Sequence, residues 1–218
     1  MPEAALLYAP RAWTPEGWRE NVLLRAGADG RWSEVTAGVA RPPAGATVLD
    51  GVLLPGLVDA HSHAFQRAFA GRAERRESDS DGFWSWRDRM YRVALRITPE
   101  QLRDVSAQLY VELLQGGYTH VCEFHYPQHG PDGRPYDDPL EMSWARADAA
   151  AETGIGLTLL PVLYERAGFG KPLRDDQRRF RTSAEQVWQA ATTIVEAHRP
   201  LLGAGLAIHS LRAASADS

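Results

Sequence analysis

The sequence predicts an α/β fold in which strands alternate with helices, preceded by a small module of short strands. Three observations indicate this. From residue 57 on, apolar runs of strand length alternate with helical repeats. Residues 4–54 carry brief apolar runs broken by turn residues instead. Polar residues follow the later apolar runs directly, and α/β barrels hold their functional side chains at such strand ends.

Composition narrows the class of protein. The net charge of −4 argues against nucleic acid as a partner, because no strongly basic surface collects phosphates. A single cysteine, Cys122, excludes an internal disulfide and suits a reducing compartment. No apolar run approaches the ~20 residues that span a bilayer, and the N-terminus lacks the pattern of a secretory signal. We therefore expect a cytoplasmic protein with no membrane partner.

Residues 1–54 are predicted to form a small β-module, expected as a β-sandwich that is incomplete within this stretch. Short apolar runs flank Ala28-Asp29-Gly30, a hairpin-type turn. Proline and glycine residues then interrupt the chain repeatedly over residues 41–56, which favours turns and short strands over a helix.

Residues 55–218 are predicted to form the α/β part. Expected strands are 57–61, 118–124, 155–164 and 203–210, and expected helices are 97–117, 139–154 and 182–199, with mixed helical character over 83–96. Thr98 and Gln101 predict a capping box at the start of the first long helix, and Thr182 and Glu185 predict another at the last one. Strands separated by helices imply parallel pairing with right-handed crossovers.

His61 and His63 stand at the end of the first apolar run. Residues i and i+2 of a strand point to one side, so both imidazoles can converge on one Zn²⁺. A catalytic zinc takes about three protein ligands, so the pair is half of a site. An isolated His-x-His is more often a pair of surface or hydrogen-bonded histidines, but the position at a strand end favours a metal.

Several segments carry a resemblance to a known family. "VLLPGLVDAHSHAFQRAFAG" resembles the first barrel strand of the amidohydrolase superfamily, where His-x-His supplies two metal ligands. "FWSWRDRMY", "EFHYPQHGPDGRPYDDP", "GIGLTLLPVLYERAGFG", "QRRF" and "IHSLRA" come next, in the order typical of the formimidoylglutamate deiminase family. The resemblance covers nearly the whole chain from about residue 50.

The resemblance implies a metal-dependent hydrolase. The fold implied is the first four strands of a (β/α)8 TIM-type barrel, thus its N-terminal half. The reaction implied is hydrolysis of N-formimino-L-glutamate to N-formyl-L-glutamate and ammonia in histidine degradation. The cofactor is one Zn²⁺ per complete site, with Fe²⁺ or another divalent metal open, and the complete protein is expected as a homodimer. The residues implied are His61 and His63 as metal ligands, and Gln66, Arg87, Tyr126, His209 and Arg212 as substrate contacts.

Alternatives stay open for these residues and for the activity. Arg87 can be a helix-surface arginine paired with Asp88 or Asp81, and Glu123 can orient a metal ligand or be a buried structural acceptor, which we favour. The third metal-binding His, the catalytic Glu and His and the metal-binding Asp of the family pattern are not found, so no catalytic residue is assigned and the 218-residue chain alone is expected to be inactive. Another deaminase of the superfamily, acting on a ring such as cytosine or guanine, is the alternative enzyme.

Overall fold

The computed structural model describes residues 5–72 and 82–218 and divides the chain into two compact units, Met1–Leu57 and Val58–Ser218. The boundary lies three residues after the one expected from the sequence. Among the described residues no helix is long and apolar enough to cross a membrane.

The first unit is one five-stranded sheet. It consists of β1 (Leu6–Thr14), β2 (Gly17–Ala26), β3 (Trp32–Thr36), β4 (Thr47–Val48) and β5 (Val52–Leu53). The order is β3-β2-β1-β4, and β5 also pairs with β1. Ala9, Ala12, Val22 and Leu24 form its buried cluster.

All five strands of the described residues of this unit join one sheet. A sandwich needs two facing sheets, so the second layer of the expected, incomplete sandwich stays a prediction. The predicted hairpin turn at 28–30 is confirmed: β2 and β3 pair antiparallel on either side of it.

The second unit has a parallel sheet with the order β11-β8-β7-β6, in which β12 also pairs with β8. The strands are β6 (Leu57–Ser62), β7 (Tyr118–His125), β8 (Gly156–Leu163), β11 (Leu202–Ala204) and β12 (Ala207–Ile208). A separate hairpin, β9 (Arg166–Gly168) with β10 (Lys171–Pro172), comes after β8.

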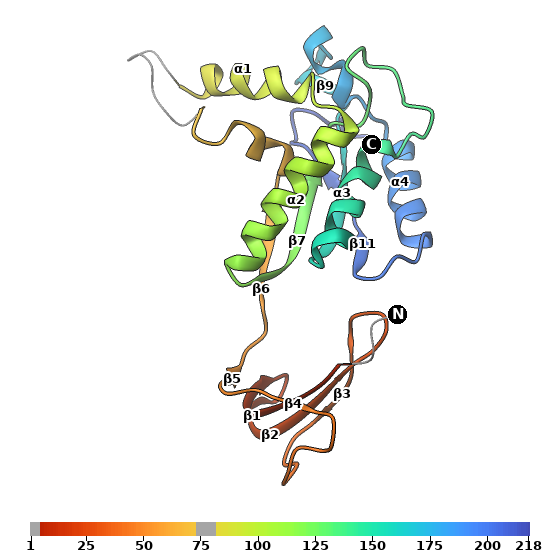
Figure 1. Ribbon diagram of the computed structural model, residues 1–218. Helices are drawn as coiled ribbons and strands as arrows, with labels where there is room; N and C mark the ends of the chain where they lie inside the picture. The colour runs from red at the N-terminus through yellow and green to blue at the C-terminus, as the bar shows by residue number, and fades with distance from the viewer. Residues whose placement is uncertain (1–4, 73–81) are drawn as a thin grey trace. The chain divides into compact units, whose positions relative to one another are not determined.

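Helices cover this sheet. They are α1 (Phe83–Ala94), α2 (Pro99–Gln115), α3 (Glu141–Thr153) and α4 (Ala184–Glu196), with the 3-10 helices η1 (Ala64–Phe69) and η2 (Asp175–Phe180). Helix α2 contacts β7, α3 and α4 contact β8, and α2 and α3 lie side by side (Figure 1). The predicted α/β class with a partial barrel is confirmed.

The predicted fourth strand, 203–210, is split. β11 pairs with Leu157–Leu159 and β12 with Val162–Leu163, so both lie along the same neighbour with a break at residues 205–206. The first strand, β6, lies at the edge of the described sheet, and its Leu57 and Val58 are exposed.

One predicted capping box is confirmed and the other is wrong. The Thr98 side chain accepts a hydrogen bond from the Gln101 N–H, and the Gln101 side chain accepts one from the Thr98 N–H. At α4 the cap is Ser183 with Gln186, one residue later than the predicted pair. Thr182 is instead bound to β8: its hydroxyl donates to the Val162 carbonyl and accepts from the Tyr164 N–H, both at 2.8 Å.

This correction gives a prediction for stability. Ser183→Ala removes the acceptor for the Gln186 N–H and should lower the free energy of unfolding by about 1 kcal/mol. Glu185→Ala should leave it within about 0.5 kcal/mol, because Glu185 takes no part in the cap. Urea unfolding of both variants measures the difference, and an equal loss in the two would contradict the assignment.

Candidate functional site

His61 and His63 bring two ring nitrogens together at the end of β6. Their Nε2 atoms lie 3.2 Å apart. Two nitrogens of a tetrahedral zinc site, each about 2.0–2.1 Å from the ion, are about 3.3 Å apart. The spacing of the pair therefore fits two ligands of one metal ion, as the His-x-His pattern predicts.

The tautomer of His63 also fits a metal ligand. Its Nδ1 lies 3.2 Å from the Phe124 carbonyl, and a carbonyl only accepts, so Nδ1 carries the proton and Nε2 keeps its lone pair. Such a bond from the second ring nitrogen is the usual support of a metal-binding histidine. Burial lowers the pKa of His63 to about 4, against the raising effect of the Phe124 bond and with smaller contributions from His61, His209 and Arg146. The ring is thus neutral at pH 7.

The pair is incomplete as a metal centre. Within residues 5–72 and 82–218 no group of three or more His, Cys, Asp or Glu side chains is arranged to hold a metal ion. A site of about three protein ligands needs at least one more than β6 supplies.

A cavity of about 270 Å³ lies next to the pair. It is lined by all seven residues singled out in the sequence, which come from β6, the residue directly after it, η1, α1 and the segments after β7 and β12: His61, His63, Gln66, Arg87, Tyr126, His209 and Arg212. Because the strands are parallel, their ends meet at one edge of the sheet. The structure brings these residues together, while their roles stay predictions.

The charge of this cavity is one-sided. Arg87, Arg166 and Arg212 line it, and no Asp or Glu is among its described lining residues. Arg87 also lies 3.5 Å from Asp88, so the pairing weighed from the sequence is present; Asp81 lies outside the described residues. Clustered guanidinium groups favour an anionic ligand, especially one with carboxylates.

Arg166 was not predicted from the sequence. It begins β9, and its guanidinium donates to the main-chain carbonyls of Arg212, at 3.1 Å from Nε, and of Leu211. It therefore fixes the segment that carries Arg212. Its signal in the sequence is its place just after the predicted strand 155–164.

Aromatic rings form the floor around His209. Its ring centroid lies 4.5 Å from that of Tyr164 and 5.5 Å from that of Tyr126. Burial, with a smaller effect of Arg212, lowers the pKa of His209 to about 4. Burial also raises the pKa of Tyr126 and of Tyr164, so both phenols keep their protons and remain hydrogen-bond donors. Gln177, also missed from sequence, donates to the Tyr164 hydroxyl at 2.9 Å.

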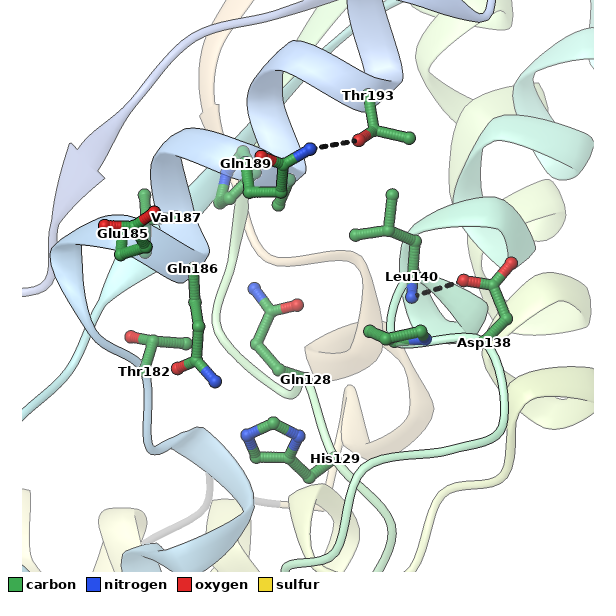
Figure 2. A pocket seen from close by; sticks show the side chains of 13 residues that line it. Gln128, His129, Asp138, Leu140, Thr182, Glu185, Gln186, Val187, Gln189 and Thr193 are labelled. Atoms are coloured by element: carbon green, nitrogen blue, oxygen red, sulfur yellow. Dashed lines mark hydrogen bonds between the residues drawn. The ribbon is translucent and has the colours of Figure 1, made fainter.

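A second, larger cavity of about 420 Å³ is lined by the segment after β7, the start of α3 and α4. Figure 2 shows Gln128, His129 and Thr182 around it, with Leu140 and Val187 among its apolar lining. None of the seven residues from the sequence lines it. Neither the histidine pair nor the arginines face this cavity, so we place the candidate site at the smaller one.

Comparisons with known proteins identify the family of this chain. Residues 52–218 match the amidohydrolase family. The chain is 48% identical over 214 residues to the formimidoylglutamate deiminase of Pseudomonas aeruginosa, covering 95% of this chain and 46% of that protein.

Solved structures are similar as well. A crystal structure of an amidohydrolase from Brucella melitensis has a TM-score of 0.86 and 40% identity, over 98% of this chain and 48% of that one. Atrazine chlorohydrolase from Arthrobacter aurescens, crystallised with zinc, has a TM-score of 0.69 at 18% identity, over 97% and 48% of the two chains, which shows a shared fold. The chain thus spans about half the length of the relatives it matches.

The low pKa values of His125 and His209 give a prediction for the pH dependence of stability. Burial holds the pKa of His209 at about 4 and that of His125 well below its usual range. Between pH 6.5 and 4 the unfolded chain binds protons that the folded chain excludes, so the free energy of unfolding falls as the pH falls, by at most about 1.4 kcal/mol per pH unit for each such histidine. Urea unfolding of the metal-free protein at pH 7 and pH 5 measures this. Equal values at both pH values would contradict it.

Proposed function

Since this chain belongs to the amidohydrolase family, we propose that it supplies the first metal ligands and a substrate-binding wall of a deiminase. The substrate is N-formimino-L-glutamate, and water converts it to N-formyl-L-glutamate and ammonia, a step of histidine degradation. The identity of 48% to a formimidoylglutamate deiminase supports this assignment.

The observation that carries the proposal is a cavity in which three arginines face a histidine pair with no lining carboxylate among the described residues. N-formimino-L-glutamate carries one carboxylate on the carbon that bears the formimino nitrogen and a second carboxylate at the far end of its side chain. A guanidinium binds a carboxylate through two parallel hydrogen bonds. Neutral rings such as cytosine or guanine offer no such charge, so this cavity favours the dicarboxylate over them.

Different side chains of the cavity bind different groups of the substrate. Arg87 and Arg212 bind the two carboxylates, and Arg166 holds the main chain of Arg212 in place. Gln66 and the protonated Tyr126 provide neutral hydrogen bonds, and the neutral His209 adds a further polar contact. Binding of the two carboxylates fixes the formimino carbon near His61 and His63, so binding energy supports the chemical step.

His61 and His63 would hold the metal through their Nε2 atoms. A divalent cation bound there supplies a Lewis acid and lowers the pKa of water to about 7. We propose zinc, although histidine ligands also suit iron and nickel. The remaining ligand, the acid and the base are assigned to the half of the relatives' length that this chain does not span.

Arginine variants of the full-length, metal-loaded protein test the proposal. Arg212→Ala and Arg87→Ala should each lower kcat/KM for N-formimino-L-glutamate by about 10- to 100-fold, mainly through a higher KM, because a charged hydrogen bond is worth roughly 1.5–3 kcal/mol. Ammonia release is the readout. Arg174→Ala is the matched control, since Arg174 pairs with Asp176 and is not among the residues that line the cavity.

Two results would speak against the proposal. An unchanged KM in both arginine variants would show that Arg87 and Arg212 do not bind the substrate carboxylates. Faster ammonia release from cytosine or guanine than from N-formimino-L-glutamate would assign the protein to the alternative class of deaminase.

A further inference from the structure

A buried carboxylate lies directly behind the histidine pair. Glu123 is on β7, and its side chain is fully buried. Its Oε1 accepts a hydrogen bond from the Ala64 N–H at 2.8 Å. Ala64 is the residue after His63 and the first of η1. The carboxylate therefore binds the main chain at the point where the histidine strand turns into the 3-10 helix.

The start of η1 needs this acceptor. The first N–H groups of a helix have no partner within it, and the N-cap side chain commonly supplies one. Here the N-cap is His63, and its side chain makes no capping bond. Its ring bonds to the Phe124 carbonyl and to His61 instead. The Glu123 carboxylate thus caps the start of η1 in place of the His63 side chain.

Neighbouring residues of β7 consequently hold neighbouring residues of the site. The Glu123 carboxylate fixes Ala64, and the Phe124 carbonyl fixes the His63 ring. Through η1 the same anchor reaches Gln66, whose N–H donates to the His63 carbonyl at 2.9 Å. Strand β7 therefore helps to fix the positions of both the His63 imidazole and Gln66, which is expected to contact the substrate.

Arg146 on α3 holds this carboxylate in place. Its Nε lies 3.1 Å from Glu123 Oε1, its Nη1 donates to the Met142 carbonyl at 2.9 Å, and its side chain is also fully buried. Burying two charges costs several kcal/mol per ion, and an apolar pair of similar volume is often as stable. Glu123 Oε2 and Arg146 Nη2 have no hydrogen-bond partner among the described residues. A contribution to stability therefore does not by itself explain why Glu123 and Arg146 are buried as a charged pair.

We propose that Glu123, oriented by Arg146, is a positioning residue that fixes the main chain at Ala64 and so holds His63 in its metal-binding orientation. This inference rests on the proposed function, because it takes His61 and His63 as metal ligands. It answers the alternative left open from the sequence: Glu123 is a buried acceptor, and the group that it accepts from adjoins a metal ligand.

The test measures zinc affinity by competition with a chromophoric chelator, together with kcat and KM, in the full-length protein. Glu123→Ala should weaken zinc binding by about 10- to 100-fold, the usual effect of losing a group that orients a ligand. Glu123→Gln keeps an acceptor for Ala64 and should lose less. Circular dichroism and thermal unfolding report on the fold of each variant.

Glu112→Gln is the matched control. The Glu112 carboxylate binds Arg67 of the same 3-10 helix through two bonds of 2.6 and 2.7 Å, but this pair is half-exposed and does not touch His63 or Ala64. Zinc affinity should stay at the wild-type value in this variant.

Each outcome decides. Folded Glu123→Ala with wild-type zinc affinity would overturn the positioning role. If that variant does not fold, Glu123→Asp decides instead, because it keeps the charge beside Arg146 but is one methylene shorter and withdraws from the Ala64 N–H. A folded Glu123→Asp with wild-type zinc affinity would make the pair merely structural. Wild-type protein that binds zinc but leaves N-formimino-L-glutamate intact would overturn the proposed function, and the zinc comparison would still judge Glu123. Wild-type protein that binds no zinc would overturn both.

Discussion

The parallel pairing of β6, β7, β8 and β12 is the constraint on which the candidate site depends. Parallel strands finish at one edge of a sheet, so the residue after each strand faces the same space. His63 comes directly after β6, Tyr126 after β7, Tyr164 after β8 and His209 after β12. These residues are up to 146 positions apart in the chain (209 − 63), and the sheet alone makes them neighbours.

The arrangement also determines which side chains of the cavity carry charge. The imidazoles of His63 and His209 are half-buried among aromatic rings, and this burial lowers the pKa of each to about 4, which keeps them uncharged at neutral pH. The positive charge of the cavity therefore resides on its arginines. The proposed metal-binding histidines thus lie beside guanidinium groups, and the proposed substrate, which carries a formimino carbon and two carboxylates, suits that combination.

Much of this could be predicted from sequence, because the signals are local. His61 and His63 share a side through strand geometry, and Thr98 and Gln101 mark a helix start through the capping pattern. The Ser183 cap was misplaced by one residue, since Thr182 fits the pattern equally well and only its bonds to β8 exclude it. Arg146, Arg166 and Gln177 act through partners distant in the chain, and no spacing rule predicts such contacts.

The central claim is that the cavity recognises a dicarboxylate next to a hydrolytic metal site. The most direct measurement compares ammonia release by the full-length, zinc-loaded protein from N-formimino-L-glutamate and from N-formiminoglycine, which keeps the reacting group and one carboxylate only. We predict a kcat/KM at least about 10-fold lower for the glycine compound, since one arginine loses its carboxylate partner. Equal kcat/KM for the two compounds would contradict the claim.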